Sequence, residues 1–187
     1  MSRFGARTRP YPYIQGWAGS RSIIKSIQTG TISTGAANSA TATINSVSVS
    51  SSYVAFIGVT QSENDSSACV TVTLTNATTV TGARQNAEGG GCNITYIVIE
   101  YFPGRIRSLQ DGTTLMSGVD TNTSTITAVN TNKAQLVYRG TNFDTAGTTT
   151  NAQARVRIIL TNTTTVTAVR GNSTNALTAA WTVVEFY

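Results

Sequence analysis

An arginine and a glutamate, two residue types that often act together in binding sites, recur at matching places along this 187-residue chain. Arg84 and Glu100 have counterparts in Arg170 and Glu185, 86 and 85 residues further on. In each half we expect the two residues on neighbouring strands, where they would form a cross-strand ion pair or a bridge to a partner protein. The sequence therefore predicts a structural pair that occurs twice.

A carbohydrate site is the other interpretation of these pairs. Tyr96 and Trp181 lie close to the two glutamates in the sequence. Polar planar groups beside aromatic rings are what sugars meet in binding sites, so a host glycan stays open as a ligand.

Catalytic residue types are scarce. The chain has no histidine, which removes the commonest general base and the commonest metal ligand. Glu63, Asp65 and Glu88 are expected in loops and lack counterparts in the second half, whereas a paired-carboxylate hydrolase needs two acids at a set separation. Two cysteines, Cys69 and Cys92, fall short of a zinc site without histidine. The sequence thus predicts no enzyme, no metal and no cofactor.

The state of the two cysteines has two interpretations. Cys69 and Cys92 could form a disulfide if the strand ends that hold them are neighbours. Two free thiols fit a chain made in a reducing cytosol, and we favour the free thiols.

Positive charge is concentrated in the first 25 residues. Five basic residues precede the first acid, Glu63, and account for the net charge of +5. Residues 1–22 also contain two prolines, which fix φ and cannot donate to a sheet, so we expect an extended arm.

The arm has three interpretations: nucleic-acid binding, a solvated terminus, or docking on a partner protein. We favour docking, because arginine, tyrosine and tryptophan are typical anchors of protein interfaces. The neutral remainder of the chain argues against nucleic acid. The candidate anchors are Arg3, Arg7, Arg9, Tyr11, Tyr13 and Trp17.

The chain contains an internal repeat. Residues 74–84 match residues 160–170 at eight of eleven positions, and residues 24–31 parallel residues 106–113. The offset grows from 82 to 86 residues, which places a short insertion in the second copy. Such a repeat predicts two tandem modules, residues 23–103 and 104–187, that pack closely because the turn at Pro103–Gly104 leaves almost no linker.

Each module is predicted to be an antiparallel β-sandwich. Thr and Val are frequent, apolar residues alternate with polar ones, and no segment has helical periodicity beyond a turn. The fold class is therefore all-β, with two sandwiches preceded by the arm. No apolar run approaches the length that spans a membrane. In the first module we expect strands at 23–33, 40–49, 53–60, 69–75, 78–84 and 93–102.

The repeated segments also resemble a known family. Residues 24–32, 39–44 and 74–84, together with 183–186 of the second copy, resemble a repeat in structural proteins of tailed bacteriophages. The closing strand is similar to that of H-type lectin-like domains of phage tail tips. The second copy departs from the pattern at 115–117.

This resemblance implies a virion structural protein, made in the host cytoplasm. The expected role is a small accessory subunit that decorates the head or takes part in tail or fibre attachment, anchored by the arm. Its partners would be capsid, portal or tail subunits and further copies of itself, for which we expect a trimer. The alternative is a lectin-like tail module that binds a host glycan.

Overall fold

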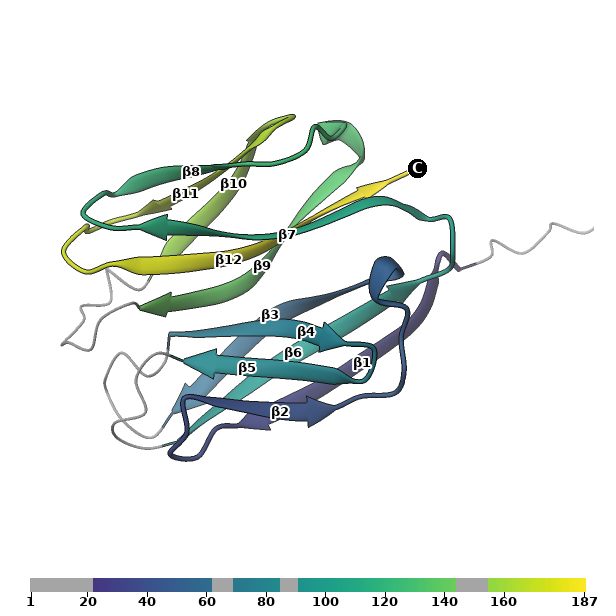
Figure 1. The fold of residues 1–187 in the computed structure, drawn as a ribbon, viewed down its shortest axis with the longest axis horizontal. Coiled ribbons are helices and arrows are strands. Elements are labelled where there is room, and N and C mark those ends of the chain that lie inside the picture. Colours follow the sequence, from purple (N-terminus) through teal and green to yellow (C-terminus); the bar gives the residue numbers. More distant parts are fainter. Residues whose placement is uncertain (1–21, 62–68, 85–90, 144–154) are drawn as a thin grey trace, which may run out of the picture.

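The computed structural model describes residues 22–61, 69–84, 91–143 and 155–187 (Figure 1). The chain is all-β and its sheets are antiparallel, as predicted. The strands of the first half are β1 (Ile24–Ser33), β2 (Ser39–Thr43), β3 (Ser52–Gln61), β4 (Val70–Asn76), β5 (Thr79–Arg84) and β6 (Cys92–Tyr101). Those of the second half are β7 (Ile106–Met116), β8 (Thr121–Thr125), β9 (Ala134–Phe143), β10 (Val156–Asn162), β11 (Thr165–Arg170) and β12 (Leu177–Phe186).

The first half is built from two sheets with a core between them. One sheet has the strand order β1-β6-β3, and β2-β5-β4 form the other. Alternate residues of each strand point into the core, as in β5, whose even-numbered residues are buried and odd-numbered ones are not. Ile32, Val54, Val72, Val80 and Ile94 form the centre of this core.

The second half repeats the strand pairing of the first. The order β7-β12-β9 corresponds to β1-β6-β3, and β8-β11-β10 corresponds to β2-β5-β4. The turns agree as well: the side-chain oxygen of Asn76 accepts a hydrogen bond from the N–H of Thr78, and that of Asn162 from Thr164. The origin of the two halves by duplication stays a prediction from the sequence.

One sheet runs through both halves. Strands β4 and β9 are neighbours, so that β2-β5-β4-β9-β12-β7 form a single six-stranded sheet. The pairing between β4 and β9 consists of one bridge, Thr71 with Gly140. Gly140 has a φ of 104°, and a Cβ there would overlap the carbonyl oxygen of Val70, so only glycine allows this approach.

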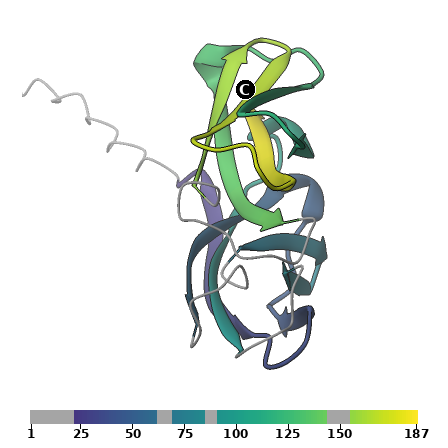
Figure 2. The ribbon, with the colours of Figure 1, turned by 90° about the vertical axis from the view of Figure 1, so that its left-hand side faces the viewer.

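An apolar interface also holds the halves together. Tyr53 and Tyr101 of the first half pack with Val137 and Val184 of the second, and Phe186 lies against the Tyr101 ring. Figure 2 shows the two halves one above the other. Strand β12 is consequently buried along nearly its whole length, in agreement with its almost continuous apolar sequence.

One predicted strand was too long. Residues 40–49 were expected in a single strand, but β2 ends at Thr43. The backbone N–H groups of Ile44 and Val47 donate instead to the carbonyls of Thr78 and Ala77, so the segment crosses the end of the β4–β5 hairpin. The second half repeats this crossing, and a short 3-10 turn follows it in each half: η1 (Val49–Ser51) and η3 (Thr131–Lys133).

Candidate attachment surface

The predicted anchors of the arm, Arg3, Arg7, Arg9, Tyr11, Tyr13 and Trp17, lie outside the described residues. The described chain starts at Ser22, whose hydroxyl accepts a hydrogen bond from the N–H of Ile24 at 3.2 Å and donates to its carbonyl at 2.9 Å. The arm is therefore joined to the described part of the chain at this point.

The connection between the halves lies beside Ser22. Phe102 donates its N–H to the carbonyl of Ile23, and Arg105 donates to the carbonyl of Phe102, which closes a tight turn. Pro103 and Gly104 occupy the two central positions of this turn. Proline is favoured at the first, and the second favours glycine because its φ is positive, here 74°. The N–H of Tyr187 in turn bonds to the carbonyl of Arg105.

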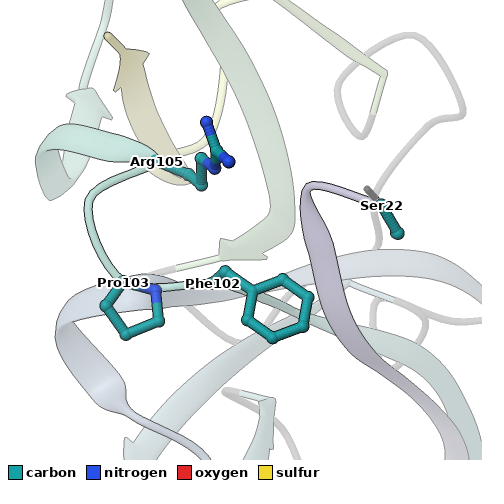
Figure 3. A pocket seen from close by; sticks show the side chains of 4 residues that line it. All are labelled: Ser22, Phe102, Pro103 and Arg105. Atoms are coloured by element: carbon teal, nitrogen blue, oxygen red, sulfur yellow. The ribbon is translucent and has the colours of Figure 1, made fainter. Parts of the chain in front are cut away.

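These contacts create a surface with a hollow of about 530 Å³, which Ser22, Phe102, Pro103 and Arg105 line (Figure 3). Ile23, Phe102 and Tyr187 are large apolar residues that remain exposed here, Tyr187 to 71%. We call this the junction surface: Ser22, Ile23, Phe102, Pro103, Arg105 and Tyr187. Its exposed rings suit apolar contacts, and the exposed Arg105 guanidinium suits a carboxylate, so its chemistry fits a protein segment.

The glutamates of the repeated pairs are buried structural groups. Glu100, only 2% exposed, receives hydrogen bonds from Lys25 Nζ at 2.8 Å, the Ser48 N–H at 2.9 Å and Ser26 Oγ at 3.0 Å. Burial opposes ionisation of this carboxyl, but the bonds from Lys25, Ser48 and Ser26 outweigh it and hold the pKa of Glu100 below its usual value.

Glu185 has the same kind of surroundings in the second half. It accepts hydrogen bonds from the N–H of Asn130 at 2.9 Å and from Ser108 Oγ at 3.3 Å, and Arg107 lies 3.6 Å away. The two glutamates thus fix the crossing segments, which contain Ser48 and Asn130, to the central strands β6 and β12.

The arginines bind backbone carbonyls. Arg84 donates from Nε to Ala37 and from Nη2 to Gly35, at 3.0 and 2.8 Å. Arg170 donates to the carbonyls of Val119, Met116, Ser173 and Asn175, and both side chains are buried. Each arginine therefore ties together the loops at one end of its half.

The predicted ion pair between arginine and glutamate is wrong. Arg84 lies in β5 and Glu100 in β6, and these strands belong to different sheets. The two residues also lie at opposite ends of β6. Arg84 bonds to Gly35, whose neighbour Thr34 bonds to Cys92 at the start of β6, whereas Glu100 is near the end of that strand. The same holds for Arg170 in β11 and Glu185 in β12.

The predicted sugar contacts are also wrong. Tyr96 and Trp181 are 2% and 3% exposed, and each lies in the core of its half. The Trp181 Nε1–H donates to the buried Thr114 hydroxyl at 3.0 Å, so its polar atom has an internal partner. Neither ring can face a ligand.

Arg139 is a buried charge that sequence reasoning missed. It extends from β9, 6% exposed, and donates to the carbonyl of Trp181 at 3.2 Å and of Gly112 at 3.4 Å. Asp111 lies 3.7 Å away, and Thr73 of the first half accepts from Nη1 at 3.4 Å. The only signal was a lone arginine in an apolar strand, at the place where the first half has Ile57.

The two cysteines are free thiols, the interpretation favoured from the sequence, and the structure shows that both are buried. Burial raises the pKa of the Cys69 thiol to about 11, although a hydrogen bond with Thr141 acts in the opposite direction. Cys92 lies beside the Thr34 hydroxyl, with 3.3 Å between sulfur and oxygen.

Among the described residues, no three acidic, cysteine or histidine side chains come together as a metal site. No helix in this part of the chain is long and apolar enough to cross a bilayer. In comparisons with known proteins, no family model, curated protein or solved structure matches the chain.

Proposed function

We propose that the protein is a virion structural subunit of a tailed bacteriophage. It decorates the head or takes part in tail or fibre attachment, and residues 1–22 anchor it to capsid, portal or tail subunits. The resemblance of the repeats to phage structural proteins suggests the setting, and the junction surface is the observation that carries the proposal.

The junction surface supports this role by its location and its composition. The arm enters the body at Ser22, and the exposed Ile23, Phe102 and Tyr187 lie around that entry. A partner that holds the arm therefore also meets apolar rings and the Arg105 cation. Clusters of aromatic residues with arginine are typical of the centres of protein interfaces.

The buried polar groups support a structural role in a second way. Each of these groups bonds to other residues of the same chain. The bonds of Glu100 and Glu185 hold the crossing segments, and those of Arg84 and Arg170 hold loops. Such bonds make a rigid body, which suits a component present in many copies. The glycan-binding alternative loses Tyr96 and Trp181, and no other described feature favours it.

Binding to virus particles tests the proposal. Purified protein is mixed with phage particles that lack it and, in parallel, with host cells, and the pellets are analysed. Sedimentation with particles at a fixed stoichiometry is expected. Binding to host cells alone, reversed by host polysaccharide, would replace the proposal with the lectin-like alternative.

Variants of the junction surface sharpen the test. Phe102→Ser should weaken particle binding, because the exposed ring is lost from the surface. Leu115→Ser is the matched control, since Leu115 is similarly exposed but lies on β7 outside the junction surface. Equal binding by both variants would remove the junction surface from the interface.

A further inference from the structure

The join between the two halves uses one edge of each. Strand β4 supplies the edge of the first half and β9 that of the second, with Thr71 opposite Gly140. At this join Arg139 of β9 is buried and its Nη1 donates to the Thr73 hydroxyl of β4. The contact is thus a close backbone approach with one polar side-chain contact beside it.

Among the described strands, edges of the same two types occur a second time without a paired strand beside them. In the first half, β3 takes the place that β9 has in the second, and in the second half β10 takes the place of β4. Within the described chain, β3 pairs only with β6, and β10 pairs only with β11. The body therefore presents one further edge of each type.

Strands β3 and β9 share one backbone feature, although Gly140 has a positive φ and Gly58 does not. Both strands contain a bulge just before a glycine. In β3 the extra residue is Ile57, between Phe56 and Gly58, and in β9 it is Arg139, between Tyr138 and Gly140. A Cβ on Gly140 would overlap β4, whereas a Cβ on Gly58 would meet nothing within 4 Å. The β3 edge is thus open around Gly58, whereas its earlier residues pack beside the second half, Tyr53 with Val137 and Phe56 with Tyr138.

An apolar side chain lies at the bulge of β3 and another at the matching place on β10, where the neighbouring Arg157 is also exposed. Ile57, in the bulge of β3, is 60% exposed and corresponds to Arg139, which is 6% exposed. Ile159 of β10 corresponds to Thr73 and is partly exposed. The polar contact of Arg139 with Thr73 inside the chain would therefore become a contact of two isoleucines between the open edges.

We propose that the partner of these edges is a second copy of this chain. The β10 edge of one copy docks on the β3 edge of the next, with Ile159 against Ile57, in the way that β4 docks on β9 within the chain. Long strand edges with exposed apolar residues are normally covered, because they offer unpaired backbone groups to other chains. The two edges differ, so the contact is head to tail and generates a ring or a filament.

The inference rests on the proposed function, in which copies of the chain assemble, and it names the residues at which they meet. Site-directed cross-linking tests it. Chains with Ile57→Cys and chains with Ile159→Cys are purified, and each is oxidised alone and in a mixture. The native thiols are buried and stay out of the reaction. A disulfide-linked dimer should form in the mixture and not in either sample alone.

The size of the assembly in solution provides the second test. Light scattering should show an oligomer of the wild-type chain. Ile57→Asp and Ile159→Asp should each give monomers with unchanged circular dichroism, whereas Leu115→Asp, at an exposed site on β7, should keep the oligomer. A wild-type chain that is monomeric at all concentrations, an oligomer that survives both substitutions, or cross-linking of either cysteine variant with itself as efficiently as in the mixture would overturn the inference.

Particle binding separates this inference from the proposed function. If the chain is monomeric and still sediments with particles, the proposed edge-to-edge contact is wrong and the attachment role stands. Head-to-tail dimers that do not bind particles would confirm the contact and end the attachment role.

Discussion

The Glu100 carboxylate accepts a hydrogen bond from the backbone N–H of Ser48 at 2.9 Å, across 52 residues of chain. Glu185 makes the same bond to Asn130 in the second half, also at 2.9 Å. Both carboxylates are nearly fully buried. Each half thus uses one buried acid to hold the segment that crosses the end of a hairpin.

Glu100→Gln should lower the free energy of unfolding by about 1–3 kcal/mol, because an amide cannot replace the ionised acceptor of three hydrogen bonds. Urea denaturation at pH 7 measures this loss. Lys25→Ala is the control: its ammonium group is half exposed and should contribute no more than about 1 kcal/mol. A smaller loss for Glu100→Gln than for Lys25→Ala would show that the Ser48 bond contributes little.

The stability of the fold should depend on pH through Glu100. The pKa of this carboxyl is lower in the folded chain than its usual 4.5, so the ionised form stabilises the fold. The contribution is complete above the unfolded-state pKa and is lost as the pH falls through the lower, folded-state pKa. Urea denaturation at pH 7 and pH 3 should show a smaller decrease for Glu100→Gln than for the wild type. Equal decreases would contradict the assignment.

Gly140→Ala should destabilise the fold by at least about 1–2 kcal/mol, since its positive φ alone costs an L-residue that amount. The overlap of the new Cβ with the Val70 carbonyl adds to this cost. Gly118→Ala is the matched control, since Gly118 also has a positive φ, 66°, but its Cβ would meet nothing within 4 Å. Thermal denaturation of both variants measures the difference. A tolerated Gly140→Ala would show that the halves can meet at a greater distance.

The Cys69 thiol should resist alkylation in the folded protein. With a pKa of about 11, only about one thiol in a thousand is ionised at pH 8, and the side chain is buried. Iodoacetamide labelling followed by mass spectrometry should detect modified Cys69 only after denaturant is added. Rapid labelling without denaturant would mean that the contact between β4 and the second half opens frequently.

Much of the fold was predictable from alternation and turn residues. The strand that starts at Val70 and the strand that ends at Arg84 fall within one residue of their predicted bounds, because apolar residues alternate regularly there. The segment after Thr43 was not predictable, since Ile44 continues the alternation of Ala40 and Ala42, while the N–H groups of Ile44 and Val47 bond to a hairpin far along the chain.

The partners of the repeated residues could not be predicted. The repeat singled out Arg84 and Glu100 as recurring positions, but it carries no information on which strands share a sheet. The join between the halves was hidden for a similar reason. It depends on Gly140 and on a single bridge to Thr71, and no periodic pattern records such a contact.

Sedimentation of a shortened chain with phage particles tests the central claim most directly. The full-length protein and a form that lacks residues 1–22 are compared on particles depleted of the protein, after circular dichroism has confirmed that both are folded. We predict that both forms have the same β-sheet spectrum and that only the full-length chain sediments, at a fixed stoichiometry. Sedimentation of the folded, shortened form at the same stoichiometry would contradict the anchoring role of the arm.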